Sequence, residues 1–469
     1  MASPSAAPKS ARPHVVVIGA GFTGLATAWR VRDGAEVTVL EASDRPGGMI
    51  HTVDFDGCRF DVGADAFLAR RPEAERLARD LGFGDEDLVA PATGNVLLWR
   101  DGRLRRLPRG TVMGAPTDIV SLATARVLSP AQLARAAAEP AVALFRRGEA
   151  RAFDDISVGE LVSRRFGRAV ADRLVDPLLA GVYAGDLFDL SARATVPQLW
   201  HAATTGSIRR HFKRQSTTKP AVDTPVFLTV RGGLSRLVTR MADTLGSALR
   251  LGEVVERIDP VVGGRWRITT KHATSYEADH VIVAVPPAVA SGVLSTVDRV
   301  VAEKLSDFAA ASVGVVALSY PNASRDTLPA ASGILAARSN DTSIVKAVTF
   351  STRKWPHMAA HPRVLLRASV GRIGDTRALA LNDEALIAQV DAEVRAMTGM
   401  VDSPVATMVM RWPAALPQYA VGHLETVAGL RDRLAASGPG IHLAGAAFDG
   451  LGLAARAAEA DRLAQLIMP

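Results

Sequence analysis

Six residues near the N-terminus have the types and spacing that hold a phosphate. They form a GxGxxG motif and are Gly19, Ala20, Gly21, Phe22, Thr23 and Gly24. In this motif the first glycine makes a tight turn, the second lets the backbone approach a pyrophosphate, and the third lets a helix pack closely on a strand. The anion lies at the N-terminus of that helix, where unpaired N–H groups and the helix dipole favour negative charge. The motif therefore predicts a dinucleotide site, provided that a strand precedes it and a helix follows.

An acidic residue stands where such a site needs one. Glu41 ends an apolar segment (36–40) that follows the motif. A carboxylate at this place accepts hydrogen bonds from the hydroxyls of an adenosine ribose and repels a 2′-phosphate, which argues against NADP. The alternative is a glycine turn without a ligand, but the order of the elements and the acid favours a nucleotide.

Two more small-residue segments follow. Gly47 and Gly48, after Arg45, would bring backbone amides to a second phosphate or a ribityl chain, whereas Arg45 itself pairs with a phosphate or caps a turn. A further close approach of the backbone is expected at 61–65 (DVGAD). A site for a nicotinamide cofactor alone needs no such second set.

The surrounding sequence has the patterns that these roles require. Strands are expected at 14–18 and 36–40 with a helix at 25–31 between them, which makes a βαβ unit. Helices are expected at 72–81 and through most of 108–185, where apolar residues recur three and four apart. Further strands are predicted at 253–257, 266–270, 280–285, 312–319 and 363–369, and 440–466 is interpreted as a strand, a glycine turn and a helix.

Composition narrows the classes of protein. The chain has 469 residues, 48% of them hydrophobic and 22% charged, which excludes disorder over most of its length. The net charge of +7 favours anionic partners, but the charge is spread along the chain without interleaved aromatics, which argues against nucleic acid. A single cysteine, Cys58, excludes a disulfide framework and fits a cytoplasmic location. No apolar run is long enough to span a membrane, and the polar N-terminal residues lack the features of a secretory signal.

Several segments together resemble a known superfamily. The sequences GAGFTG (19–24), LEASDRPGGMI (40–50) and FDVGADAF (60–67) are similar to the opening of FAD-dependent oxidases of the amine oxidase and protoporphyrinogen oxidase superfamily. Residues 278–287 resemble the strand that closes the FAD sheet, and 441–452 resemble the last flavin-contacting turn. A closer resemblance is to the bacterial HemY-type porphyrinogen oxidases, carried by LLAGVYAGD (178–186), KWPH (354–357) and RWPAALPQYAVGH (411–423).

The resemblance implies an α/β fold with three parts. These are a Rossmann-like FAD-binding domain of the GR2 or amine-oxidase type, a mixed-sheet substrate domain and a helical insertion. The implied boundaries are a disordered tail (1–13), an FAD-binding domain (14–90, 222–290 and 425–469), a substrate-binding domain (91–110, 186–221 and 291–424) and a helical domain (111–185). In the superfamily the helical part can touch a membrane, and its Arg-rich helices here allow a peripheral membrane contact. No feature of the sequence indicates an oligomeric state.

The implied activity is the oxidation of coproporphyrinogen III to coproporphyrin III, or of protoporphyrinogen IX to protoporphyrin IX, in haem biosynthesis. A meso carbon gives hydride to flavin N5, and dioxygen reoxidises the flavin with release of hydrogen peroxide. Because the cofactor performs the chemistry, no strong general base is needed and no side chain is assigned as catalytic. Two alternatives remain open, namely an oxidase or desaturase of the same fold for a specialised metabolite, an amine or an amino acid, and a porphyrin- or FAD-binding protein without turnover.

Site residues follow from their positions in the matching motifs. Besides the first motif, the resemblance assigns cofactor contacts to Glu41, Ala42, Arg45, Gly47, Gly48, Met49, Gly63, Ala64, Asp65, Ala66, Val255, Gly445, Gly452, Leu453 and Ala454. Candidate substrate contacts are Phe67, Arg70, Arg71, Tyr183 and Lys354. Arginine forks suit the propionates of the substrate, with the run 104–109 (LRRLPR) as a weaker candidate. Phe67 and Tyr183 wall a pyrrole or belong to the core, and Lys354 approaches the flavin or only shapes a loop.

No metal site is expected, because the histidines have no ligand spacing around them. Non-covalent FAD is expected, because Cys58 lies far in sequence from the C-terminal region where some relatives carry a flavin-linked cysteine.

The last helix departs from the pattern of the superfamily. Arg456 stands where a small thiol is usual, Glu459 where a small hydroxyl is usual, and Ala460 where a glycine is usual. Met49 stands where a lysine or similar polar residue is common. Arg456 and Glu459 are three residues apart and either pair with each other or alter the edge of the flavin. A superfamily member recruited to another substrate would carry changes of this kind.

Overall fold

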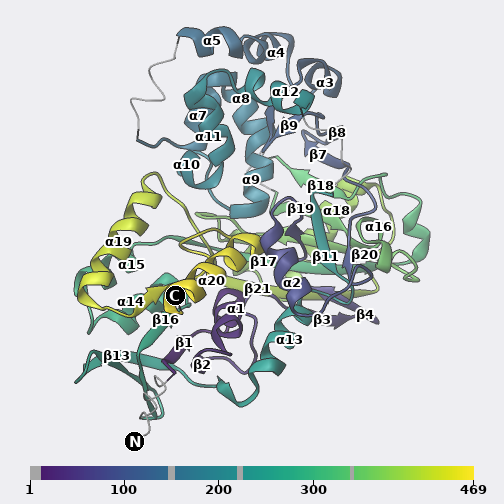
Figure 1. The fold of residues 1–469 in the computed structure, drawn as a ribbon. Coiled ribbons are helices and arrows are strands. Elements are labelled where there is room, and N and C mark those ends of the chain that lie inside the picture. Colours follow the sequence, from purple (N-terminus) through teal and green to yellow (C-terminus); the bar gives the residue numbers. More distant parts are fainter. Residues whose placement is uncertain (1–11, 146–153, 219–224, 338–342, 469) are drawn as a thin grey trace, which may run out of the picture.

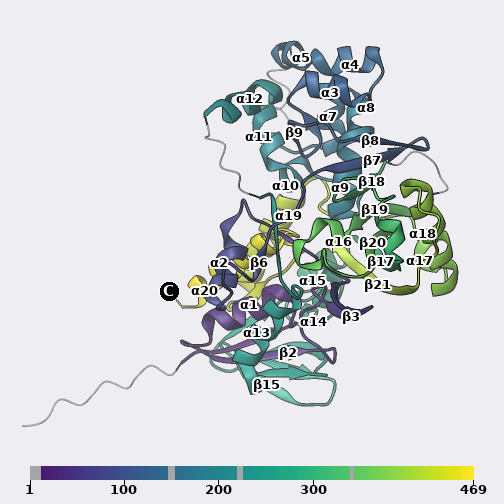
Figure 2. The ribbon, with the colours of Figure 1, turned by 90° about the vertical axis from the view of Figure 1, so that its right-hand side faces the viewer.

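The computed structural model describes residues 12–145, 154–218, 225–337 and 343–468. Most of the predicted tail, 1–11, therefore lies outside the described residues, as does 146–153 of the predicted helical domain. Figures 1 and 2 show a helical layer at one end of the molecule and two sheets with their covering helices at the other.

The first sheet has five parallel strands in the order β12-β2-β1-β16-β22. Its strands are β1 (His14–Ile18), β2 (Glu36–Glu41), β12 (Leu249–Leu251), β16 (His280–Val283) and β22 (Ile441–Leu443). The middle of β1 is a run of three valines that are fully buried, because a parallel sheet is covered on both faces. The predicted strands at 14–18 and 36–40 are confirmed. One expectation is wrong. Residues 278–287 were expected to close this sheet, but their strand β16 lies inside it, and β22 forms the edge on that side.

Helices cover one face of this sheet, and a small sheet with further helices covers the other. The first face carries α1 (Phe22–Val31), α13 (Ser235–Leu245), α20 (Leu453–Ile467) and α2 (Pro72–Asp80), which share one hydrophobic core. The second face carries β13 (Val255–Val261), β14 (Arg265–Thr270) and β15 (Ser275–Ala278), with α14 (Pro287–Leu294), α15 (Arg299–Ser306) and α19 (His423–Ser437).

The second sheet is mixed and has seven strands in the order β21-β17-β20-β19-β18-β7-β8. Its strands are β7 (Val96–Arg100), β8 (Arg103–Arg106), β17 (Ala310–Tyr320), β18 (Gly333–Ala336), β19 (Val345–Phe350), β20 (Val364–Val370) and β21 (Ala406–Pro417). All neighbouring strands are antiparallel except β18 and β7. Helix α18 (Asp383–Thr398) packs on this sheet around a core that includes the buried ring of Tyr320.

The helical layer is larger than the sequence predicted. Its elements are α3 (Ile119–Ala125), α4 (Pro130–Ala137), α5 (Glu139–Phe145), α7 (Val158–Phe166), α8 (Arg168–Val170), a π-helical turn (Ala171–Val175), α9 (Asp176–Tyr183), α10 (Ala192–Thr195), α11 (Pro197–Thr205) and α12 (Ile208–Thr218). The buried residues of α10 and α11 belong to the same hydrophobic core as those of α7 and α9. Helices α10–α12, which the predicted boundaries place in the substrate-binding domain, thus pack in this layer.

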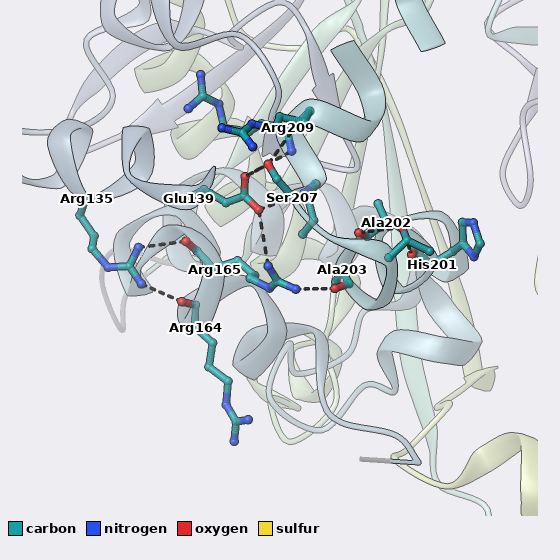
Figure 3. A network of polar contacts seen from close by, with 12 residues as sticks. Arg135, Glu139, Arg164, Arg165, His201, Ala202, Ala203, Ser207 and Arg209 are labelled. Carbon is teal, nitrogen blue, oxygen red and sulfur yellow. Dashed lines mark hydrogen bonds and ion pairs between the residues drawn. The ribbon is translucent and has the colours of Figure 1, made fainter. Parts of the chain in front are cut away.

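A buried ion pair joins the helices of this layer (Figure 3). The carboxylate of Glu139 is fully buried and accepts hydrogen bonds from the backbone N–H of Ile208 at 2.9 Å and from the hydroxyl of Ser207 at 2.6 Å. The side chain of Glu139 therefore caps the first turn of α12 from another helix. The Arg165 guanidinium lies 3.8 Å from the same carboxylate and donates to the carbonyl of Ala203, so the buried carboxylate has a cation beside it.

The remaining elements are short and connect the layers. They are β3 (Thr52–Phe55), β4 (Cys58–Asp61), β5 (Phe67–Leu68), β6 (Leu88–Val89), β9 (Thr111–Val112), β10 (Ala115–Pro116), β11 (Phe227–Val230), α16 (Ser351–Lys354) and α17 (Arg377–Ala380). Cys58 begins β4 and packs against an apolar cluster, and burial raises the pKa of its thiol. Among the described residues, no helix is both long enough and apolar enough to cross a bilayer.

Candidate active site

The glycine motif turns tightly from β1 into α1. Gly19 has φ +101°, and a side chain on Gly24 would meet the carbonyl oxygen of Gly19 at 2.0 Å, so both places need glycine. Gly21 caps the N-terminus of α1, and no atom lies within 4 Å of the position of its missing Cβ. The loop therefore has open space at the place where the motif predicts a phosphate.

Glu41 holds this loop from the end of β2. Its carboxylate accepts hydrogen bonds from the N–H of Ala20 at 2.6 Å and from the N–H of Ser43 at 3.0 Å. The N–H of Glu253 donates to the carbonyl of Glu41, which brings the start of β13 and the buried Val255 to the same corner of the sheet. Ala42 follows Glu41 directly. The residues predicted for the adenosine end of the cofactor thus lie together.

The second glycine segment lies beside the first. The N–H of Gly47 donates to the carbonyl of Ala20 at 2.7 Å, and Gly21 and Gly47 pair as an isolated bridge. Arg45 donates to the carbonyl of Gly48 at 2.8 Å and lies over the ring of Trp412, so its guanidinium holds the loop. Burial lowers the pKa of Arg45.

A cavity of about 290 Å³ opens where these loops meet the second sheet. Its predicted lining residues are Gly21, Phe22, Thr23, Arg45, Gly47, Gly48, Met49 and Gly445. The rest of the lining consists of residues 284–287, Ala310, 412–415, Pro417, 446–447 and Arg456. Residues 446–447 belong to the turn expected to contact the flavin, and Arg456 is one of the residues expected either to pair or to alter the edge of the flavin. The other lining residues were not predicted as cofactor contacts. We call this cavity the interdomain cleft. Among the described residues, no three His, Cys, Asp or Glu side chains gather as a metal site would require.

Other predicted cofactor residues do not line the cleft. They are Gly19, Ala20, Gly24, Glu41, Ala42, Gly63, Ala64, Asp65, Ala66, Val255, Gly452, Leu453 and Ala454. Of these, the segment 63–66 is hydrogen-bonded to both sides of the cleft, namely the glycine loops and the second sheet. The N–H of Ala64 donates to the carbonyl of Met49 at 3.1 Å, and Arg367 of β20 donates to the carbonyl of Gly63.

The N-terminus of α20 also points to the cleft. The first backbone hydrogen bond of this helix runs from the N–H of Arg456 to the carbonyl of Gly452 at 3.1 Å. Gly445, with φ +118°, and the side chain of Arg456 both line the cleft. The Nε of Arg456 is buried and has no hydrogen-bond partner among the described residues, and burial lowers the pKa of this guanidinium. A cation without a bonded acid thus faces the cleft.

Glu459 takes partners other than Arg456. Its side chain is buried, and its carboxyl accepts a hydrogen bond from the N–H of Gly445 at 2.9 Å and lies 3.5 Å from Arg431. Burial and the neighbouring Asp449 raise the pKa of Glu459 to about 9. Burial alone would raise the pKa of Asp449 as well, but hydrogen bonds from Arg431 and Glu459 lower it well below its usual range. This pKa favours the protonated form of Glu459 at neutral pH, and the Glu459 carboxyl supports the glycine turn before α20.

The five predicted substrate residues do not line the interdomain cleft. Lys354 lies 2.9 Å from Asp65, and although burial opposes it, the charges of Lys354 and Arg367 lower the pKa of Asp65 to about 2. Phe67 is buried in the core beneath α1, and Arg70 is exposed.

The other two predicted substrate residues have partners within the protein. Arg71 pairs with Glu73 at 2.9 Å. Tyr183 is buried, with its ring 5.8 Å from that of Tyr419, and burial raises the pKa of Tyr183 to about 12. The aromatic pair lies at the base of the helical layer, where α9 meets the chain after β21.

The cleft has the architecture of a flavin enzyme, and a family comparison agrees. The family model described as flavin containing amine oxidoreductase matches residues 22–467. The chain belongs to this family. It is therefore a flavin-dependent oxidoreductase, and the expected α/β flavoenzyme fold is confirmed.

Several relatives of this flavin-dependent oxidoreductase are named as porphyrinogen oxidases. The chain is 34% identical to the coproporphyrinogen III oxidase of Bacillus subtilis, covering 94% of this chain and 95% of the relative, and 36% identical to the coproporphyrinogen III oxidase of Mycobacterium tuberculosis, covering 95% of each. It is also 30% identical to a chloroplastic protoporphyrinogen oxidase of Nicotiana tabacum, covering 93% of this chain and 82% of that relative.

Solved structures show the same fold. A candidate protoporphyrinogen oxidase from Exiguobacterium sp. 255-15 superimposes with a TM-score of 0.85 at 29% identity, covering 97% of this chain and 99% of the other. A putrescine oxidase variant superimposes with a TM-score of 0.72 at 20% identity, covering 97% and 98%. The second likeness concerns the fold alone.

Proposed function

We propose that this enzyme oxidises a porphyrinogen with dioxygen, converting coproporphyrinogen III to coproporphyrin III or protoporphyrinogen IX to protoporphyrin IX. The observation that supports this most strongly is the near-complete match to coproporphyrinogen III oxidases, together with a cleft between a nucleotide sheet and a second, mixed sheet. On this proposal the enzyme acts in haem biosynthesis in the cytoplasm.

The residues of the cleft and of the adjoining loops fit an FAD molecule. Gly21 and the free N–H groups at the start of α1 would bind the pyrophosphate, and Glu41 would accept hydrogen bonds from the ribose next to the adenine. The free N–H groups of the first turn of α20 would lie at the other end, beside Arg456. We propose non-covalent binding, because the single cysteine, Cys58, belongs to β4 and does not line the cleft.

The bound flavin would supply the hydride acceptor, and the chain would supply position and shielding. Trp412 fixes one wall, because its indole N–H donates to the carbonyl of Val62 at 2.9 Å. Residues 284–287 and 446–447 form walls without ionisable groups, so they would lie against the flat ring of the flavin and shield it from water. The Lys354–Asp65 ion pair anchors the segment 63–66 against α16.

The test is a turnover measurement with separate readouts for cofactor and substrate. The purified protein is examined for a flavin absorption spectrum, mixed with coproporphyrinogen III without oxygen, and then exposed to air. Porphyrin fluorescence that rises well above autoxidation, with hydrogen peroxide in proportion, is the expected result. A flavin-containing protein that accelerates oxidation of neither coproporphyrinogen III nor protoporphyrinogen IX would contradict the proposal.

A second candidate function is an oxidase of the same fold for another substrate. Its support is the unpartnered cation of Arg456 in the cleft and the buried Glu459 behind it, which depart from the superfamily pattern. A screen of amines and amino acids for peroxide formation, on the same flavin-loaded sample, separates this candidate from the first. A peripheral membrane contact of the helical layer is likewise a proposal, and flotation with anionic liposomes tests it.

A further inference from the structure

A face of the β7–β8 hairpin carries three arginines. Because side chains alternate along a strand, Leu98 and Arg100 of β7 share a face with their partners Arg105 and Arg103 of β8. The residues between them, including Leu104, pack into the core of the second sheet. This face thus carries Leu98, which is buried against the helical layer, beside a row of guanidinium groups.

Two more arginines approach this face from the helical layer. Arg126 follows α3, and Arg173 lies in the π-helical turn, and both line a cavity of about 330 Å³ together with the three arginines of the hairpin. The apolar floor consists of Leu98, Val127 and Ala337. We call this cavity the arginine pocket. It shares no lining residue with the interdomain cleft.

The arginine pocket continues into a larger groove. The groove has a volume of about 1290 Å³ and shares Arg105 and Arg126 with the pocket. It adds Arg106 and Arg109, and its apolar lining includes Leu97 and Leu107. Together the two spaces are large enough for a drug-sized or larger ligand and combine apolar walls with several cations.

The five arginines of the pocket outnumber its acids, because Asp101 is the one acid among its described lining residues. Arg100 lies 3.0 Å from Asp101, which is itself largely exposed, whereas Arg173 donates to a backbone carbonyl and an amide oxygen. Burial, and then the charge of Arg100, lower the pKa of Arg173. Within the described part of the chain, Arg103, Arg105 and Arg126 form no ion pair.

The local geometry holds these charges together at a cost in free energy. Arg100 and Arg103 are direct cross-strand partners, and like charges in that relation are destabilising. Arg126 has φ +51°, a conformation that L-residues rarely adopt, and Arg173 lies on a π-helical turn, which is found often at functional sites. Several unfavourable features at one cavity indicate that an anion completes it.

We infer that the arginine pocket binds the carboxylates of a tetrapyrrole outside the interdomain cleft, as a second site for the porphyrin product. Guanidinium forks pair with carboxylates in a bidentate way, and the apolar floor suits the face of a flat ring. A free phosphate has no apolar face that could pack on that floor. The inference rests on the proposed function, because that function supplies the tetracarboxylate ligand.

The test is a binding isotherm of coproporphyrin III with the flavin-loaded enzyme. The variant R103Q/R105Q removes two cations of the pocket, and R76Q/R240Q removes two exposed arginines of α2 and α13 as a control for net charge. The parent and the control are expected to bind porphyrin in two classes of site. The pocket variant is expected to bind porphyrin at least tenfold more weakly at one class of site, with the affinity of the other class unchanged.

Identical isotherms for the parent and R103Q/R105Q would overturn the inference, and so would an equal loss in R76Q/R240Q. If the double variant does not fold, the single variant R126Q gives the same readout. A second arm measures binding to vesicles of anionic phospholipid. If R103Q/R105Q weakens vesicle binding but not porphyrin binding, the inference is also overturned. Porphyrin binding without porphyrinogen turnover would refute the proposed function alone.

Discussion

Glu459 provides a test of the electrostatics behind the flavin turn. Its pKa of about 9, raised from 4.5 by burial and by Asp449, means that the folded protein keeps a proton that the unfolded chain releases above pH 4.5. The native state therefore loses stability as the pH rises from 4.5 toward 9. The substitution Glu459→Gln keeps the shape of the protonated carboxyl. Its amide can donate to Asp449, and its oxygen can accept from the N–H of Gly445.

The size of the effect follows from the binding of one proton. Between pH 6 and 8 the parent loses about 1.4 kcal/mol of unfolding free energy per pH unit through this group, and Glu459→Gln does not. An unfolding entropy of about 2.1 cal/mol/K per residue converts this to about 1.4 °C per pH unit for a chain of 469 residues. The melting temperature of the variant relative to the parent is thus expected to rise by about 3 °C between pH 6 and pH 8.

The assay is a thermal melt of the flavin-loaded protein at several pH values, followed by tryptophan emission. Glu303→Gln is the matched control, because Glu303 is exposed and paired with Arg299 on α15. The difference between the control and the parent is expected to stay constant with pH. A constant difference for Glu459→Gln as well would refute the reasoning, since it would mean that Glu459 is ionised in the native protein.

Three further outcomes are expected. Gly24→Ala should yield protein with little bound flavin, because the new Cβ would meet the Gly19 carbonyl. Gly429→Ala is the control and should bind flavin normally, because there is open space around Gly429. Flavin absorbance per protein chain measures both. Arg456→Met should lower the flavin reduction potential by about 30 mV or more, because a nearby cation stabilises the charge gained on reduction; equal potentials in spectroelectrochemical titration would contradict this. Arg165→Met should destabilise the protein by about 3–5 kcal/mol in denaturant titration, and a loss below 1 kcal/mol would show that the buried acid has another counter-charge.

The nucleotide half of the molecule could be predicted because its signals are local. The valines of β1, the glycines of the motif and Glu41 lie within thirty residues, and each has one physical role in a βαβ unit. The boundaries of these elements are accordingly close to the prediction. The opposite wall of the cleft is formed by 412–415 on β21, which pairs with β17 and reaches the flavin loops through a hydrogen bond from Trp412 to Val62, 350 residues earlier in the sequence. No local pattern marks such an arrangement.

Other features were missed as well, and for one of them a local signal was present. Asp101-Gly102 is a strong hairpin signal between two alternating runs, and it forms the turn between β7 and β8. Glu139 is fully buried, whereas acids are usually placed at the surface, so its role as a cap for α12 depends on a partner 26 residues or more away in sequence. The expected pairing of Arg456 with Glu459 is absent from the described contacts, because Gly445 and Arg431 compete for the same carboxyl.

The lining of the interdomain cleft limits which groups can control its chemistry. Arg45 and Arg456 are its only ionisable residues within the described chain, so the walls offer two cations and no base. Arg45 is engaged by the carbonyl of Gly48, and it therefore holds a loop. Arg456 keeps a buried Nε without a partner, and it therefore is the group that can respond to charge on a bound molecule. Because flavin chemistry needs no side-chain base, a substitution at this one position can change the electrostatics of the cleft while the nucleotide site stays intact.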